Sequence, residues 1–320
     1  MFLKGLQIIP ADTKFDIIGK RKIAFALSFV LLTMSIFFIA TKGLNFGIDF
    51  TGGTVVEIQT EKVEDLSALR VALNNLGLGS VSLQTFGAET ELLIRLREQE
   101  GDAKVQDAAI DKVTDLLTER ITAGYELRRT EFVGPQVGEE LKKAGLLAII
   151  FSLGGILVYI WFRFEWQFGV AAIAALAHDA IATIGLFAFL QMEFNLSTVA
   201  ALLMIAGYSI NDTVVVFDRV REMLRKYKKT ALGEVFNRAI NSTLSRTVMT
   251  SVTTLLALVA LWVFGGEVIQ GFVDALIFGI LIGTYSSIFV ASPVLMLFDL
   301  RHGAKKAAVD SDSENDANKA

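Results

Sequence analysis

The sequence predicts a polytopic α-helical membrane protein of six transmembrane helices that carries one α+β domain outside the membrane. Three observations support this fold class. The 320 residues are 53% hydrophobic, with a mean hydropathy of +0.52. The charged residues, 20% of the chain, are clustered and leave six long apolar stretches between them. A single polar segment of roughly one hundred residues alternates strand-like and helix-like patterns.

The six apolar stretches are each long enough to cross a hydrocarbon core of roughly 30 Å as a helix. The first follows Lys20, Arg21 and Lys22, as a signal peptide would, but no small-residue cleavage site comes after it, so we interpret it as an uncleaved anchor. The predicted spans are residues 23–40, 144–162, 168–190, 196–217, 247–264 and 272–298.

Basic residues predict the orientation of the chain, because Lys and Arg are enriched in cytoplasmic loops. They cluster in the N-terminus, residues 1–22, and in the loop of residues 218–246. Both segments are therefore expected in the cytoplasm, the second with an amphipathic helix along the membrane surface. The polar tail, residues 299–320, is expected to be cytoplasmic and disordered.

Residues 41–143 then form the only large segment on the opposite side of the membrane. Their pattern is strand, helix, strand, strand, helix, strand, the order of a split βαβ or ferredoxin-like domain. Such a domain is a common binding platform, but its fold alone does not identify a ligand.

Composition argues against an enzyme or a cofactor protein. The chain has no cysteine and two histidines, and it shows no Ser-His-Asp set or Gly-rich phosphate loop. Its net charge of −4 does not favour nucleic acid. No metal, cofactor or catalytic residue is expected.

Asp212 and Arg246 are the residues most suited to carrying protons. An acid inside the bilayer costs about 2.5–3.5 kcal/mol at mid-helix, so its default interpretation is functional. Asp212 lies in the fourth span, and Arg246 lies at the cytoplasmic start of the fifth, near the same side of the membrane. A movement that separates the two would load and unload a proton. The alternative is a structural carboxylate that nearby polar groups satisfy.

Other polar residues could support this path. Asp179, an acid midway along the third span, follows His178, which we interpret as structural. Asn211 is adjacent to Asp212, and Arg219, just after the fourth span, shares a helix face with Asp212. The supporting candidates are Asn211, Asp179, Thr250, Thr253 and Arg219; the two threonines extend a hydroxyl stripe from Arg246 and could equally bond the backbone of their own helix.

Several motifs together resemble the SecF family of protein-export subunits, within the resistance–nodulation–division (RND) permease superfamily. The resemblance covers about residues 1–300, in family order, and leaves out the acidic tail. The motifs are "DFTGG" at 49–53, "VGPQVG" at 133–138, "AHD" at 177–179, "GYSINDTVVVFDR" at 207–219, "NSTLSRTVMTSVTTLL" at 241–256 and "GTYSSIFVASP" at 283–293.

The resemblance implies half of an RND-type bundle in a bacterial inner membrane. Members pair with SecD to complete a twelve-helix unit, associate with the SecYEG channel and commonly with YajC and YidC, and use the proton-motive force to promote preprotein translocation. The family's proton-path residues fall on Asp212 and Arg246. Motif residues to which we assign a structural role are Asp49, Gly52, Gly53, Gly134 and Pro135.

Two other functions stay open from the sequence. The chain could be a scaffold that stabilises the translocation complex without conducting protons. It could also be a subunit of a small-molecule or lipid exporter of the same superfamily, although its outside domain is small for that role.

Overall fold

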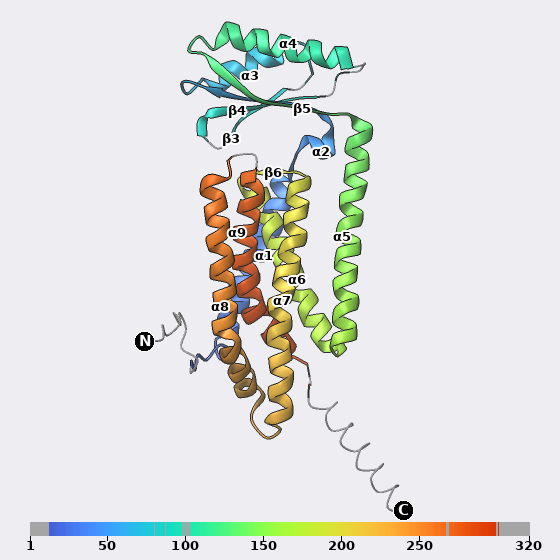
Figure 1. The fold of residues 1–320 in the computed structure, drawn as a ribbon, viewed down its shortest axis with the longest axis vertical. Coiled ribbons are helices and arrows are strands. Elements are labelled where there is room, and N and C mark those ends of the chain that lie inside the picture. Colours follow the sequence, from blue (N-terminus) through green and yellow to red (C-terminus); the bar gives the residue numbers. More distant parts are fainter. Residues whose placement is uncertain are drawn as a thin grey trace, which may run out of the picture. The chain divides into compact units, whose positions relative to one another are not determined.

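The computed structural model describes residues 13–79, 81–86, 88–97, 99, 103–266, 269–298 and 300. Within these ranges, six helical segments are long and apolar enough to cross a membrane, as the sequence predicts (Figure 1). The segments are α1 (Arg21–Lys42), α5 (Pro135–Arg163), α6 (Trp166–Leu190), α7 (Leu196–Lys226), α8 (Leu232–Phe264) and α9 (Gln270–Ser286), which continues through the π-helix η2 (Ser287–Ala291) into α10 (Ser292–Leu295).

The chain divides into two compact units. A helical unit comprises residues 1–44, 150–192 and 200–320, and an α+β unit comprises residues 45–149 and 193–199. The helix α7 therefore contributes its first turn to the α+β unit and the rest of its length to the helical unit. The predicted domain, residues 41–143, corresponds to most of the α+β unit. The unit also includes residues 193–199, which the prediction did not assign to it.

Small residues allow close packing inside the helical unit. A Cβ atom built on Gly185 of α6 would lie 2.2 Å from Cβ of Ser35 of α1. A Cβ atom built on Gly279 of α9 would lie 2.2 Å from Cδ1 of Ile205 of α7. Neither contact leaves room for a larger residue, which is how small side chains bring membrane helices together.

The loop of residues 218–246 differs from its prediction. Both neighbouring helices extend into it, so that α7 ends at Lys226, α8 begins at Leu232, and no separate surface helix forms. The apolar face expected on the membrane surface is instead buried in the protein core with Ile17 and Ile18. Its buried members are Val235, Phe236, Ala239 and Ile240. The N-terminal segment therefore covers the face that we had assigned to the membrane.

The α+β unit has the predicted order of strands and helices: β2 (Gly53–Thr60), α3 (Leu66–Asn74), β3 (Val81–Phe86), β4 (Ala88–Leu96), α4 (Ala103–Arg120) and β5 (Tyr125–Val133). The sheet order is β3-β4-β2-β5 with every neighbouring pair antiparallel, which is the ferredoxin-like arrangement. Residues Val56, Ile58, Leu73, Leu92 and Leu117 are among those that form its core.

Three short elements of this unit were not predicted. The strand β1 (Asn45–Phe46) pairs in parallel with β6 (Glu193–Phe194), and the helix α2 (Ile48–Thr51) follows β1. In addition, α5 begins at Pro135, before the predicted start of the span at residue 144. The predictions for residues 1–12 and for the tail beyond residue 300 lie outside the described part of the chain.

Candidate functional site

Asp212 lies on α7 and receives hydrogen bonds from two other helices. The hydroxyl of Thr247 on α8 donates to Oδ1, and the hydroxyl of Ser287, at the start of η2, donates to Oδ2. The carboxyl group is partly buried. Both oxygens therefore have a partner, as a charged or polar group within a membrane protein requires.

Arg246 immediately precedes Thr247 on α8. Its side chain is exposed on the described chain. The direct hydrogen bonds to Asp212 come from hydroxyls, and the pairing of Asp212 with Arg246 stays a prediction.

The supporting residues on α7 and α8 are arranged differently from the expectation. Thr250 donates to the Arg246 carbonyl at 2.8 Å and Thr253 to the Met249 carbonyl at 2.9 Å, so both bond their own helix and face outward. Arg219 pairs with Glu222 at 2.6 Å and with Ser242 at 2.9 Å, and Asn211 is exposed. The structure does not bring these four side chains into the hydrogen-bonding shell of Asp212.

Asp179 forms a second polar centre, and it is only 1% exposed. Its Oδ2 accepts hydrogen bonds from Ser209 of α7 at 2.6 Å and from Ser286 of α9 at 2.7 Å. Its Oδ1 lies 3.0 Å from Nδ1 of His178, which is 2% exposed. Three polar partners therefore compensate the burial of this acid.

Further hydroxyl groups lie near Asp212 on α7, α8 and α9. Thr247 donates to Asp212, and one turn further along α8 Ser251 lies 2.7 Å from Oγ1 of Thr284 on α9. Tyr208, one turn before Asp212 on α7, donates to Ser251 at 3.2 Å. Ser251 donates to the backbone carbonyl of Thr247 at 3.0 Å, so the hydroxyls of Tyr208, Ser251 and Thr284 form a cluster one turn from Thr247 rather than a continuation of its bond to Asp212.

The sequence did not identify these hydroxyl partners as functional. Serine and threonine are common in membrane helices, where they usually bond the backbone of their own helix. The signal that could have found them is spacing. Thr247 and Ser251 are four residues apart on α8, and Ser209 and Asp212 are three apart on α7. Residues three or four apart lie on the same face of a helix, so each pair shares a face.

The "DFTGG" motif forms a tight turn between α2 and β2. Gly52 has φ +68° and Gly53 has φ +113°, both values that residues with a Cβ rarely adopt. Gly138 of α5 packs on this turn, because a Cβ atom there would lie 3.3 Å from N of Gly52. Gly134 and Pro135 mark the end of β5 and the start of α5. The two glycine motifs thus meet within the α+β unit, which fits the structural role expected for them.

Within the described ranges, no group of three or more His, Cys, Asp or Glu side chains is placed to hold a metal ion. The fold and the two polar centres together define a class: a multi-pass α-helical membrane protein with a ferredoxin-like domain and with acids hydrogen-bonded between its helices.

Comparisons with known proteins give the family. Residues 112–301 match the model of the protein export membrane protein SecD/SecF, C-terminal, and residues 37–62 match the SecD/SecF GG motif. The chain is 45% identical over 298 residues to the protein translocase subunit SecF of Rickettsia bellii (strain OSU 85-389), covering 93% of this chain and 98% of the relative. It is 44% identical over 306 residues to that of Rickettsia rickettsii (strain Sheila Smith), covering 96% and 99%.

Solved structures agree with these matches. The crystal structure of SecDF from Thermus thermophilus aligns with a TM-score of 0.81 at 38% identity. The alignment covers 91% of this chain and 39% of the SecDF chain, so this chain corresponds to well under half of that protein. SecDF in its super-membrane-facing form aligns with a TM-score of 0.66 at 37% identity.

The chain therefore belongs to the SecD/SecF family. It is a multi-pass membrane subunit of the Sec protein-export machinery.

Proposed function

We propose that the chain is a proton-driven export subunit in which Asp212 carries the proton. The observation that supports this most directly is the placement of Asp212, an acid in a membrane-spanning helix held by hydroxyls from two other helices. When Asp212 is ionised, Arg246 and the hydroxyl donors are attracted to it. When it is protonated, that attraction falls, and α7 becomes free to shift relative to α8 and α9.

The chain is proposed to act with SecD, as the two-part SecDF structures suggest. An observation on α8 favours a covering partner. Arg246, Thr250 and Thr253 are all exposed on a helix that spans the membrane. Hydroxyl side chains are enriched where membrane helices pack on one another, so a second protein that covers this face is the favourable arrangement. The wider assembly would contain SecYEG, with YajC and YidC, and a translocating preprotein.

The proposed location is a bacterial inner membrane, with both termini in the cytoplasm and the α+β unit in the periplasm. The basic residues before α1 and around the α7–α8 connection support this orientation. The chain has no cysteine, so single cysteines placed at Lys14 and at Glu64 can be labelled with a membrane-impermeant thiol reagent in intact cells. Labelling of position 64 alone is expected, and labelling of position 14 alone would reverse the orientation.

The proton role is tested by export of a secreted reporter into proteoliposomes that contain the assembled complex and carry an imposed proton gradient. Asp212→Asn and Arg246→Met are expected to reduce export to the level without a gradient while the amount of assembled complex stays constant. Glu222→Gln is a matched control, since it removes one negative charge from the same helix at an exposed position. Unchanged export in Asp212→Asn would favour the scaffold function instead.

Co-purification separates the remaining alternative. A subunit of a small-molecule exporter should be recovered with an outer-membrane channel, whereas an export subunit should be recovered with SecD. Recovery with the channel and without SecD would reject the proposed function.

A further inference from the structure

The aspartate of the "DFTGG" motif contacts the first residue of α7. Oδ2 of Asp49 accepts a hydrogen bond of 2.9 Å from the backbone N–H of Leu196, 147 residues away in the chain. The first N–H groups of a helix have no partner within the helix, and a negative charge there is stabilised by the helix dipole. Asn195 already caps α7 by accepting from N–H of Thr198 at 3.0 Å. Asp49 therefore adds a second acceptor that comes from another part of the chain.

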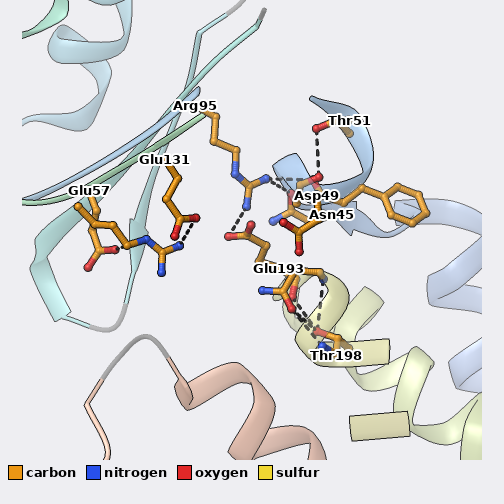
Figure 2. Close-up of polar contacts among 12 residues, drawn as sticks. Asn45, Asp49, Thr51, Glu57, Arg95, Glu131, Glu193 and Thr198 are labelled. Carbon is orange, nitrogen blue, oxygen red and sulfur yellow. Dashed lines mark hydrogen bonds and ion pairs between the residues drawn. The ribbon is translucent and has the colours of Figure 1, made fainter. Parts of the chain in front are cut away.

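An ion pair lies beside this contact. Arg95 of β4 bonds Glu193 of β6 at 2.8 Å and donates to Oδ1 of Asn45 on β1 at 2.7 Å (Figure 2). The side chains of Arg95 and Glu193 are only 13% and 19% exposed. The β1–β6 ladder places Asn45 opposite Glu193. We call the residues Asn45, Asp49, Arg95 and Glu193 the α7 anchor.

The anchor is distinct from the other charged cluster in the same view. Arg129 on β5 pairs with Glu131 at 3.0 Å and lies 3.9 Å from Glu57, so this cluster stays within the sheet (Figure 2). Arg95 instead extends from the sheet to the segment that leads into α7. The two clusters offer a comparison between a charge pair that reaches α7 and one that does not.

The helix α7 links the anchor to the proposed proton site. It runs without interruption from Leu196 to Lys226, and Asp212 lies 16 residues after Leu196, or about 24 Å along the axis at 1.5 Å per residue. Residues 193–199 belong to the α+β unit and the rest of α7 to the helical unit. The contact of Asp49 is therefore made to the first residue of the same helix that carries Asp212.

We propose that Asp49 and Arg95 are positioning residues that tie the α+β unit to α7, so that movement of this unit alters the hydrogen bonds of Asp212. The inference rests on the proposed function and extends it. It assigns the "DFTGG" aspartate a role in coupling export to proton movement. Without the anchor, protons still reach Asp212, but their movement no longer drives the α+β unit.

The test measures two quantities in the same proteoliposomes of full chain and partner: exported reporter and dissipated proton gradient. Arg95→Glu and Glu193→Arg each place like charges together, and the double exchange restores opposite charges. Each single variant is expected to export about tenfold less protein per proton, the effect of losing one charge-assisted contact. The double exchange is expected to recover the ratio. Asp49→Ala should behave like the single variants, and Asp49→Asn, which keeps an acceptor oxygen, should recover.

Arg129→Glu with Glu131→Arg is the matched control, because that pair lies on the same sheet and does not reach α7. An unchanged export-to-proton ratio in the single variants would overturn the inference. So would a loss of export and proton flux in parallel with a loss of assembled complex, because that pattern denotes a purely structural role. Asp212→Asn is run alongside. If it leaves the proton flux intact, the proposed function fails, whatever the anchor variants do.

Discussion

Ser286 and Ser287 are adjacent in the chain, yet they donate hydrogen bonds to two different carboxylates, Asp179 and Asp212 respectively. Adjacent residues on an α-helix point about 100° apart, so one position can face α6 while the next faces α7. The π-helical segment Ser287–Ala291 begins at this point, and such wide turns often mark functional sites. The two polar centres of the helical unit are therefore joined through two adjacent serines on the sixth spanning segment.

The first prediction concerns Ser287. Ser287→Ala removes one of the two hydroxyl donors to Asp212, and hydrogen bonds to charged groups contribute about 1.5–3 kcal/mol. We expect proton-driven export to fall by about tenfold or more, as a change of this size implies. Ser287→Thr keeps a hydroxyl and should retain most activity. The initial rate of reporter export in proteoliposomes measures both, and full activity in the alanine variant would contradict the prediction.

Ser286 is expected to act on stability instead. Ser286→Ala leaves Asp179 with Ser209 and His178 as partners but removes one donor from an acid that is 1% exposed. Loss of this charge-assisted bond should lower the free energy of unfolding by about 1–3 kcal/mol. Thermal unfolding of the purified chain with its partner, followed through the tryptophan fluorescence of the spanning helices, tests this. A thermal midpoint equal to that of the unaltered chain would show that Asp179 does not need the third partner.

The sequence predicted the acids of the site but not their partners. Asp212 was identifiable because an acid in an apolar run is rare. Thr247 and Ser287 were not, because they come from helices distant in the chain and because hydroxyls are ordinary there. Thr250 and Thr253 lie with Arg246 on the exposed side of α8, and their supporting role stays a prediction. Periodicity shows which residues of α8 share a face, but only its neighbours α7 and α9 determine which face turns toward them.

For the fold too, some features could be predicted from the sequence and others could not. Long apolar runs and the alternation of strands and helices were sufficient for the six helices and the ferredoxin-like order. The elements β1 and α2 have two and four residues, too few to show a period. The face around Phe236 was correctly recognised as apolar, but the sequence analysis assigned it to the membrane surface, whereas it is buried in the protein core. The covering residues Ile17 and Ile18 lie more than two hundred positions away, in a segment whose only evident signal was its positive charge.

Close packing of α1 and α6 gives a stability prediction. Any side chain at position 185 collides with Ser35, so Gly185→Ala forces the helices apart. Overpacking of this kind typically costs about 1–3 kcal/mol. Gly154→Ala of α5 is the matched control, since a Cβ atom there meets nothing within 4 Å in the described chain. The thermal midpoint of unfolding should be lower for Gly185→Ala and unchanged for Gly154→Ala. Equal midpoints would mean that α1 shifts to accept the added methyl group at no cost in stability.

Glu57 gives a prediction for pH. Burial in the sheet raises the pKa of its carboxyl, and the Arg129 guanidinium only partly opposes this. The folded state therefore binds a proton more tightly than the unfolded state, so this group's contribution to stability is largest below the unfolded pKa and is lost as pH rises through the folded pKa. Glu57→Gln should remove that loss and slow hydrogen exchange of β2 at neutral pH. Exchange rates should be corrected for the intrinsic rate at each pH before they are compared. Faster exchange of β2 in Glu57→Gln than in the unaltered chain would contradict a raised pKa of Glu57.

The last prediction concerns the N-terminal segment and its contact with α8. Oδ1 of Asn237 accepts hydrogen bonds from the backbone N–H groups of Ile17 at 3.0 Å and Ile18 at 2.9 Å. Asn237→Ala leaves both donors without this acceptor, at a cost of about 1–3 kcal/mol for each one that stays buried. Hydrogen exchange of residues 15–18 should then accelerate by about tenfold or more, since each 1.4 kcal/mol is a factor of ten.

Arg238→Ala is the control for Asn237→Ala, because Arg238 is adjacent on α8 and pairs at 2.6 Å with exposed Glu234 rather than with the segment. Its exchange at residues 15–18 should match the unaltered chain. If Asn237→Ala leaves this exchange unchanged as well, burial of Ile17 and Ile18 alone holds the segment against α8. In that case the hydrogen bonds of Asn237 orient the segment but add little to the free energy that holds it. Ile18→Ala should then accelerate hydrogen exchange of residues 15–18, whereas Asn237→Ala does not.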